Sequence, residues 1–154
     1  HLTQLDIPTL QVKALHRING EAHTVAIYSP LPGRTLRDIV NSNEADANLM
    51  YRLGVFLARV QRQGVYFRSI HPGNIIVNGM DFGLIDILDM RIHWWSLSRW
   101  ARRRNWRHFF RYPRDWENHG DLIEALIKGY RHSADLPLRE LNWLERIIGK
   151  FIST

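Results

Sequence analysis

Residues 66–86 read YFRSIHPGNIIVNGMDFGLID, and this stretch decides the fold that the sequence predicts. A polar loop ends at Asn74, a short apolar run follows, and an Asn-Gly turn leads into a second apolar run that ends at Asp86. Asn-Gly between two apolar runs is typical of a β-hairpin. The pattern therefore predicts an amide and a carboxylate at the open end of one hairpin, a combination suited to binding a magnesium–phosphate complex.

Toward the N-terminus, residues 10–30 contain two apolar-rich runs around Asn19-Gly20 and predict a second β-hairpin. The segment Pro30-Leu31-Pro32-Gly33 continues neither strand nor helix and is typical of a hinge. Capping residues then predict a short helix over residues 35–40 and a longer one from Ser42-Asn43 to residue 63.

Toward the C-terminus, the apolar spacing predicts helices over residues 96–111, 115–132 and 137–152, with Pro113 ending the first of them. In the last helix the apolar residues recur at helical spacing and are most simply a core face: Leu138, Leu141, Leu144, Ile148 and Phe151. The order is strands, a linker and then mainly helices with one inserted hairpin, which defines an α+β fold class.

The composition suits one packed domain, with 154 residues of which 45% are hydrophobic. The formal net charge of +6 and the isoelectric point near 10.2 favour an anionic partner, although many small basic proteins have none. The chain has no cysteine, which excludes disulfides, thiol nucleophiles and zinc-thiolate sites and is compatible with a reducing cytoplasm. No apolar run approaches the roughly 18 residues of a membrane-spanning helix.

Residues 69–76, Ser-Ile-His-Pro-Gly-Asn-Ile-Ile, resemble the Asp-Leu-His-Pro-Gly-Asn-Ile-Leu loop of aminoglycoside and choline phosphotransferases. Arg68 stands where protein kinases have the arginine of His-Arg-Asp. With GLIDILDMRI and an arginine-rich segment after this loop, the chain is most similar to the bacterial lipopolysaccharide-kinase-like group, which includes toluene tolerance proteins. The resemblance covers residues 8–130, and the loop with its hairpin is the specific part.

The resemblance implies a protein-kinase-like fold, present mainly as its helical C-terminal lobe with a partial β N-lobe. Residues 1–33 are then a remnant of the small β lobe and the hinge. Residues 34–154 are the helical lobe, with the catalytic-type loop at 66–74 and the metal-site hairpin at 75–87. In this fold a glycine-rich phosphate loop and a lysine-bearing strand come before the first hairpin, and residues 1–9 contain nothing similar. The chain also starts without methionine, so we expect it to be truncated at its N-terminus.

The resemblance also implies ATP and magnesium as cofactors, since phosphoryl transfer needs metal ions that bridge the phosphates. Asn74 and Asp86 match the amide and the carboxylate that hold magnesium and nucleotide in the family. Asp81-Phe82-Gly83 spells the metal-binding tripeptide of protein kinases, but it lies at the hairpin turn, too soon after Asn74. We therefore interpret the tripeptide as a coincidence and assign metal binding to Asn74 and Asp86.

Ser69 stands where the family has its catalytic aspartate, and a serine has neither the charge nor the basicity of that residue. His71 can in principle act as a base, because the ordinary histidine pKa is near neutrality. The family has a histidine there beside its aspartate, which favours a scaffolding role for His71. Asp89 is a further acidic residue, interpreted as structural or distant from the phosphates. Ser69, His71 and Arg68 are the catalytic candidates.

Residues 91–114 contain eight arginines and four tryptophans and no acidic residue. Arginine suits phosphate, and tryptophan is at home at a membrane interface. The segment predicts a surface for a phosphorylated glycolipid or an anionic membrane, with single-stranded nucleic acid as a weaker alternative. A solvated basic helix whose aromatic rings pack on the domain is the plainer alternative. The candidate binding residues are Arg99, Arg102, Arg103, Arg104, Arg107 and Trp106.

Three functions remain open. The first is an ATP-dependent phosphotransferase that acts on a sugar hydroxyl, such as one of a lipopolysaccharide core, in the cytoplasm and peripheral to the inner membrane. The second is a pseudokinase that has lost catalysis through Ser69 and serves as a binding or scaffold module at an anionic membrane surface. The third and weaker one is a membrane or nucleic-acid binder that uses only the basic helix.

Overall fold

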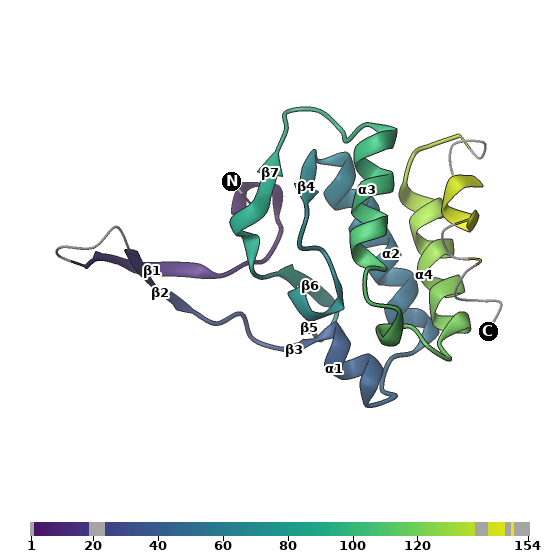
Figure 1. Ribbon diagram of the computed structural model, residues 1–154, viewed down its shortest axis with the longest axis horizontal. Helices are drawn as coiled ribbons and strands as arrows, with labels where there is room; N and C mark the ends of the chain where they lie inside the picture. Colours follow the sequence, from purple (N-terminus) through teal and green to yellow (C-terminus); the bar gives the residue numbers. More distant parts are fainter. Residues whose placement is uncertain (1, 19–23, 138–141, 147–148, 150–154) are drawn as a thin grey trace.

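The computed structural model describes residues 2–18, 24–137, 142–146 and 149. The long helices lie together on one flank, short strands lie beside them, and one hairpin projects from the body as an arm (Figure 1). A hydrophobic core runs through the body and includes Leu2 and Ile7 near the N-terminus. The first residues therefore pack into the same core as the helices.

Helices α2 (Ala47–Arg62) and α4 (Gly120–Ser133) form the centre of the helical layer. Their backbones meet at two glycines, because a Cβ atom at Gly54 would clash with the backbone of α4, and one at Gly129 would clash with the backbone of α2. Glycine thus permits a closer approach of the two helices than any larger residue would.

Helix α3 (Arg99–Phe109) contacts α4 through the rings of Trp106 and Tyr130, whose centroids are 4.9 Å apart. It begins after Ser98, whose Oγ accepts a hydrogen bond from the Ala101 amide at 3.3 Å. Its inner face carries part of a cluster of aromatic rings whose centroids lie 4.9–5.7 Å apart, and such pairs add to the stability that burial provides. The cluster consists of Trp106, Phe109, Phe110, Trp116 and Tyr130.

Two small sheets complete the body. Strands β5 (Ile75–Asn78) and β6 (Asp81–Leu84) form the predicted hairpin, and β3 (Arg34–Thr35) extends it to three antiparallel strands in the order β3-β5-β6. Strand β4 (Val65–Phe67) pairs antiparallel with β7 (Met90–Ile92). The two sheets bracket the loop that carries the conspicuous sequence motif.

The projecting arm is a hairpin of β1 (Gln11–Arg17) and β2 (Thr24–Ser29), which confirms the strands predicted within residues 10–30. Apolar side chains on both strands are exposed, among them Leu15 and Ile27. The predicted turn at Asn19-Gly20 lies outside the described residues. In the last predicted helix Leu144 is buried, and the other four residues of the expected core face also lie outside the described part.

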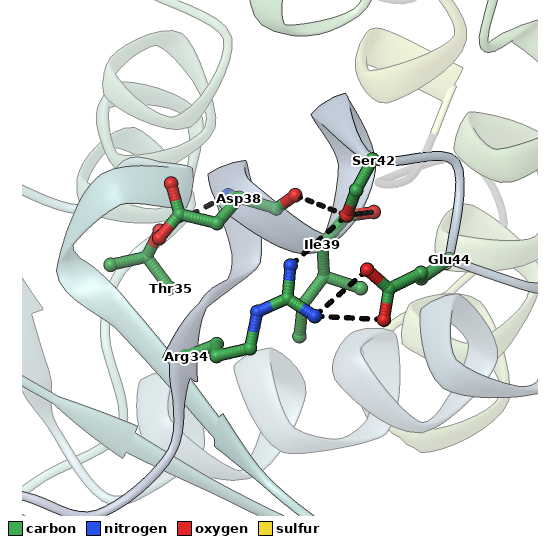
Figure 2. Close-up of polar contacts among 6 residues, drawn as sticks. All are labelled: Arg34, Thr35, Asp38, Ile39, Ser42 and Glu44. Carbon is green, nitrogen blue, oxygen red and sulfur yellow. Dashed lines mark hydrogen bonds and ion pairs between the residues drawn. The ribbon is translucent and has the colours of Figure 1, made fainter.

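The short helix α1 (Leu36–Asn41) is the helix predicted over residues 35–40, and side chains close both of its ends (Figure 2). At the start, Oγ1 of Thr35 accepts a hydrogen bond from the backbone N–H of Asp38 at 3.1 Å. At the end, the hydroxyl of Ser42 donates to the carbonyl oxygen of Asp38 at 2.7 Å. Such caps satisfy backbone groups that a helix leaves without partners.

Three predicted helix starts are wrong by a few residues. Helix α2 begins at Ala47 rather than after Ser42-Asn43, since Asp46 accepts a 2.7 Å hydrogen bond from the Leu49 amide. Helix α3 begins at Arg99 and not at residue 96. Helix α4 begins at Gly120 and not at residue 115, since Pro113–Asp115 forms a separate 3-10 turn.

Candidate functional site

The loop between β4 and β5 carries most of the predicted site, and buried contacts fix its beginning. Strand β4 ends at Phe67, whose carbonyl oxygen accepts a 2.6 Å hydrogen bond from the side-chain amide of Asn105 in α3. Both residues are buried, and Ile70 in the loop lies in the hydrophobic core. Ser69 lies between these two anchors and therefore has a defined place.

Asn74 and Asp86 lie together at the open end of the β5–β6 hairpin. The Nδ2 atom of Asn74 lies 3.4 Å from Oδ2 of Asp86 and donates a 3.0 Å hydrogen bond to the carbonyl oxygen of Ser69. The Ile85 amide donates to the Asn74 carbonyl oxygen at 3.1 Å, which joins the two arms of the hairpin. Asn74 is buried and Asp86 is exposed, so the protein holds the amide while the carboxylate faces solvent.

This pair of side chains fits a magnesium ion that also binds phosphate. Asn74 uses its amide nitrogen within the protein, which leaves its oxygen Oδ1 for a ligand, and Asp86 adds an exposed carboxylate. Within the described ranges, no group of three or more His, Cys, Asp or Glu side chains can hold a metal ion. Magnesium keeps several waters and needs only one or two protein carboxylates besides substrate phosphates. The pair therefore suits a metal that arrives with a nucleotide.

Asp86 also redirects the chain. Its backbone is left-handed, with φ 55° and ψ 49°, a conformation that aspartate tolerates better than most residues. The chain then forms a 3-10 turn over Ile87–Asp89. This turn brings Asp89 to the loop, where Oγ of Ser69 donates a 2.8 Å hydrogen bond to Oδ2 of Asp89. The sequence favoured a structural or phosphate-distant role for Asp89 over that of an acidic substitute at Ser69, and the structure places the two residues in contact.

The literal tripeptide Asp81-Phe82-Gly83 lies at the other end of the ribbon. Asp81 pairs with Asn78 beside the turn, whereas Leu84 pairs with Ile75 at the open end. Phe82 is buried in the core, and a Cβ atom on Gly83 would clash with the side chain of Leu31. This geometry supports the interpretation of the tripeptide as a structural coincidence.

His71 supports the loop in the structure. Its Nδ1 atom accepts a 3.1 Å hydrogen bond from the Gly73 amide, and its ring meets Tyr112 edge to face at 5.4 Å. Burial lowers the pKa of His71, and the positive charge of Arg37 lowers it further. Because Nδ1 already accepts from the Gly73 amide, these contacts fit a scaffolding role for His71, and its part in catalysis stays a prediction.

Arg37 and Asp115 form an ion pair beside this loop, and the sequence indicated neither residue. The Nε and Nη2 atoms of Arg37 donate to the two carboxylate oxygens of Asp115 at 2.9 and 2.8 Å. The Arg37 guanidinium also lies 5.4 Å from the ring centre of Tyr112 and close to Gly73. The ion-pair partners are 78 residues apart, so no local pattern links them.

Arg68 is exposed at the start of the loop. Among the described residues we find no hydrogen bond or ion pair for its side chain. Its charge acts on His108, whose pKa is lowered first by burial and then by Arg111, Arg104 and Arg68. Within the described residues, Asn105 and Arg37 contact the loop or the strand end before it, and the sequence indicated neither. The catalytic part of Arg68 stays a prediction.

Helix α3 divides the predicted anion-binding residues into two groups. Arg99, Arg103, Arg104 and Arg107 are exposed. Arg102 and Trp106 are buried, with 3% and 1% of their surface exposed, which corrects the expectation that they face an external partner. Arg102 instead donates to Oγ of Ser96 at 2.7 Å and to the Leu97 carbonyl oxygen at 3.0 Å. Trp106 belongs to the aromatic cluster of the core.

Unlike Trp106, three other tryptophans of this segment are exposed. Trp94 is 97% exposed, and Trp95 and Trp100 are also largely exposed. Arg104 lies 5.2 Å from the ring centre of Trp100, a cation–π contact. We name the exposed set the Arg/Trp surface: Trp94, Trp95, Arg99, Trp100, Arg103, Arg104 and Arg107.

Taken as a whole, the chain has a kinase-like fold. A solved structure with this fold is WaaP in complex with acyl carrier protein, which matches with a TM-score of 0.64 and 15% sequence identity over 99% of this chain and 69% of the WaaP chain. At this identity the likeness shows the fold alone. No family model matches the sequence, and no curated protein matches it either. None of the helices in the described residues is long and apolar enough to cross a membrane.

Proposed function

We propose that the protein is a phosphotransferase of the lipopolysaccharide-kinase-like kind, which uses ATP and magnesium to phosphorylate a sugar or glycolipid hydroxyl. The observation that carries the proposal is the pairing of Asn74 and Asp86, 3.4 Å apart at the open end of a hairpin in a kinase-like fold. The sequence resemblance assigns an amide and a carboxylate at these positions to magnesium and nucleotide.

The protein contributes mainly positioning to such a reaction. When bound, magnesium would supply positive charge to the phosphate groups. Asp86, at the end of the hairpin, and the Oδ1 atom of Asn74, in the loop, would hold it. Ser69 lies next to this pair, because its carbonyl oxygen accepts a hydrogen bond from Asn74. Its hydroxyl donates to Asp89, so the hydroxyl oxygen can accept a hydrogen bond from the acceptor hydroxyl.

The Arg/Trp surface gives the proposal its partner. Four exposed arginines and three exposed tryptophans lie on α3 and on the segment before it. Arginine binds phosphate groups, and tryptophan rings settle at the headgroup level of a bilayer. We therefore propose that the protein works at an anionic membrane, where a lipid-linked sugar is available as acceptor.

One observation favours a second function, a pseudokinase that binds without transferring phosphate. Ser69 stands where the resembled family has aspartate. In that case the nucleotide site and the Arg/Trp surface serve a binding or scaffold role, and phosphate transfer is absent.

Nucleotide binding by the full-length protein tests the proposal. Titration calorimetry with ATP, with and without magnesium, should show binding that depends on the metal. Asp86→Asn should weaken this binding by about tenfold or more, which corresponds to ~1.4 kcal/mol. Asp81→Asn is the matched control, because it makes the same change at the far end of the same ribbon. No ATP binding by the full-length protein would contradict the proposal, and binding without phosphate transfer would select the pseudokinase.

A further inference from the structure

The carboxylate of Asp89 lies beside Ser69, the loop position at which the resembled family has an aspartate. Ser69 donates its hydroxyl hydrogen to Oδ2 of Asp89 at 2.8 Å. We propose that Asp89 is a positioning residue for phosphate transfer: it holds the Ser69 hydroxyl toward the acceptor and takes up the proton that the acceptor loses. This inference rests on the proposed function, and it deepens that function by naming where the missing negative charge lies.

A continuous chain of polar contacts joins Asp89 to Asn74 and Asp86, the proposed magnesium-binding side chains. Asp86 lies against the amide nitrogen of Asn74, which donates to the backbone carbonyl of Ser69, and the Ser69 side chain donates to Asp89. The backbone of Ser69 contacts Asn74, and its hydroxyl contacts the carboxylate of Asp89. Ser69 therefore links the Asn74–Asp86 pair to Asp89.

The second oxygen of Asp89 shows that this carboxylate is not neutralised within the protein. Oδ1 of Asp89 is buried and accepts no hydrogen bond from the described residues. No described lysine or arginine forms an ion pair with it. A buried carboxylate oxygen without a hydrogen-bond partner carries a desolvation cost. Such a group can accept a proton through Ser69, which a fully paired structural aspartate would do poorly.

The proposed step conserves atoms and charge. The acceptor oxygen forms a bond to the γ-phosphorus of ATP while the bond from that phosphorus to the bridging oxygen breaks, and ADP leaves. The acceptor proton passes to Oγ of Ser69 as the Ser69 proton passes to Oδ2 of Asp89. The carboxyl group then releases the proton to solvent, so that each turnover yields the phosphorylated acceptor, ADP and one proton.

The contact itself can be tested without nucleotide, because the chain has no cysteine and a single introduced thiol reports on its own surroundings. A carboxylate beside a thiol disfavours the reactive thiolate. In Ser69→Cys the alkylation by iodoacetamide should therefore be slow, and adding Asp89→Asn should accelerate it, by about tenfold for each unit of thiol pKa. Ser29→Cys, a half-buried position on β2, is the control whose rate should not respond to Asp89→Asn.

Steady-state ATP consumption then tests the role, measured with water or a sugar as the acceptor. Asp89→Asn should lower kcat by about a hundredfold with an unchanged KM for ATP, the usual size of a general-base effect. The variant that relocates the carboxylate, Ser69→Asp combined with Asp89→Ser, should recover most of the loss. The exchange keeps a hydrogen-bonded serine–carboxylate pair, so the control is Ser69→Asn combined with Asp89→Ser, which can keep a hydrogen bond between these positions but has no carboxylate. A purely structural contact predicts that both double variants recover, whereas the proposed role predicts recovery only with the carboxylate.

The outcomes separate the inference from the function on which it rests. Absence of metal-dependent ATP binding by the full-length protein overturns the proposed function, and the catalytic role of Asp89 with it, whatever the thiol shows. If the protein binds ATP but Asp89→Asn does not change the alkylation rate of Ser69→Cys, only the inference is overturned. ATP turnover that is unchanged in Asp89→Asn also overturns only the inference. Turnover that is absent from the wild type while ATP is bound overturns the inference together with phosphate transfer, and selects the pseudokinase.

Discussion

Arg37 of α1 and Asp115 of the turn after α3 form a two-point ion pair, with donor–acceptor distances of 2.9 and 2.8 Å. The pair is partly buried and closes over the loop that carries His71 and Asn74. Asp115→Asn should lower the free energy of unfolding by about 1–2 kcal/mol, since it removes the charge that satisfies a partly buried guanidinium. Urea denaturation measures this change.

The exposed ion pair of Arg34 and Glu44 provides a matched comparison for Asp115→Asn. The Arg34 side chain donates to the Glu44 carboxylate at 2.7–2.8 Å (Figure 2), so the pairs resemble each other in contact distance and differ in exposure. Glu44→Gln should leave stability nearly unchanged, because solvent screens such pairs. Equal effects of the two substitutions would contradict the structural role of Asp115.

Asn105→Ala should loosen the start of the loop. It leaves the buried carbonyl oxygen of Phe67 without its donor, which costs about 1–3 kcal/mol of unfolding free energy. Asn48→Ala makes the same change on the exposed face of α2 and should have little effect. If both variants unfold at the same urea concentration, Asn105 does not anchor the loop.

Two histidines should make stability depend on pH. The pKa of His71 is lowered mainly by burial and then by Arg37, and that of His108 mainly by burial and then by Arg111. Each histidine therefore contributes stability above its unfolded pKa, and this contribution is lost as the pH falls through the lower folded pKa. The free energy of unfolding should decrease between about pH 7 and 5, and less steeply in His71→Asn and His108→Asn. A slope that these substitutions leave unchanged would contradict the assignment.

Two neighbouring arginines of α3 should respond differently to the same substitution. Arg102→Met leaves the Ser96 hydroxyl and the Leu97 carbonyl oxygen without their buried partner, so the unfolding free energy should fall by about 1–3 kcal/mol. Arg103→Met alters an exposed side chain and removes its cation–π contact with Trp143, so it should cost less, at most about 0.5–1 kcal/mol. Thermal unfolding of the two variants measures the difference, and a stable Arg102→Met would show that the buried contacts contribute little.

Membrane binding should depend on the exposed arginines. Arg103→Glu combined with Arg104→Glu should abolish sedimentation with vesicles that contain anionic phospholipid, with each arginine contributing about 1 kcal/mol near such a surface. Lys13→Glu combined with Arg17→Glu changes the net charge equally on the exposed hairpin arm and should leave binding largely intact. Loss of binding in both double variants would indicate a response to net charge rather than to the Arg/Trp surface.

The sequence predicted those parts of the site that depend on local contacts. Asn74 and Asp86 are 12 residues apart across one Asn-Gly hairpin, so the turn alone brings them together. The contact of Ser69 with Asp89 was not foreseeable, because it depends on the left-handed backbone at Asp86, and no glycine marks that position. The pairing of Arg37 with Asp115 depends on tertiary packing, which the sequence does not show locally.

The sequence predicted the basic helix in the correct region, but the prediction of which of its side chains face solvent was partly wrong. Arginines occur on both the buried and the exposed faces of α3, so the pattern of polar residues does not reveal which side is buried. Arg102 is buried through hydrogen bonds to Ser96 and Leu97 that lie outside the helix, and arginine is rarely buried without such partners. The exposed aromatic rings precede the helix or lie at its start, where helical periodicity gives no guidance.

The contacts of the site and the contacts of its supports differ in their separation along the chain. Those that join Ser69, Asn74, Asp86 and Asp89 span 5, 12 and 20 residues, whereas the supports from Asn105 and Arg37 span 38 and 78 residues. Contacts between near neighbours lose little chain entropy and form early, while distant ones wait for the surrounding helices. The loop and hairpin can therefore assemble before the helical layer closes on them, and the last folding events determine how the assembled site is oriented.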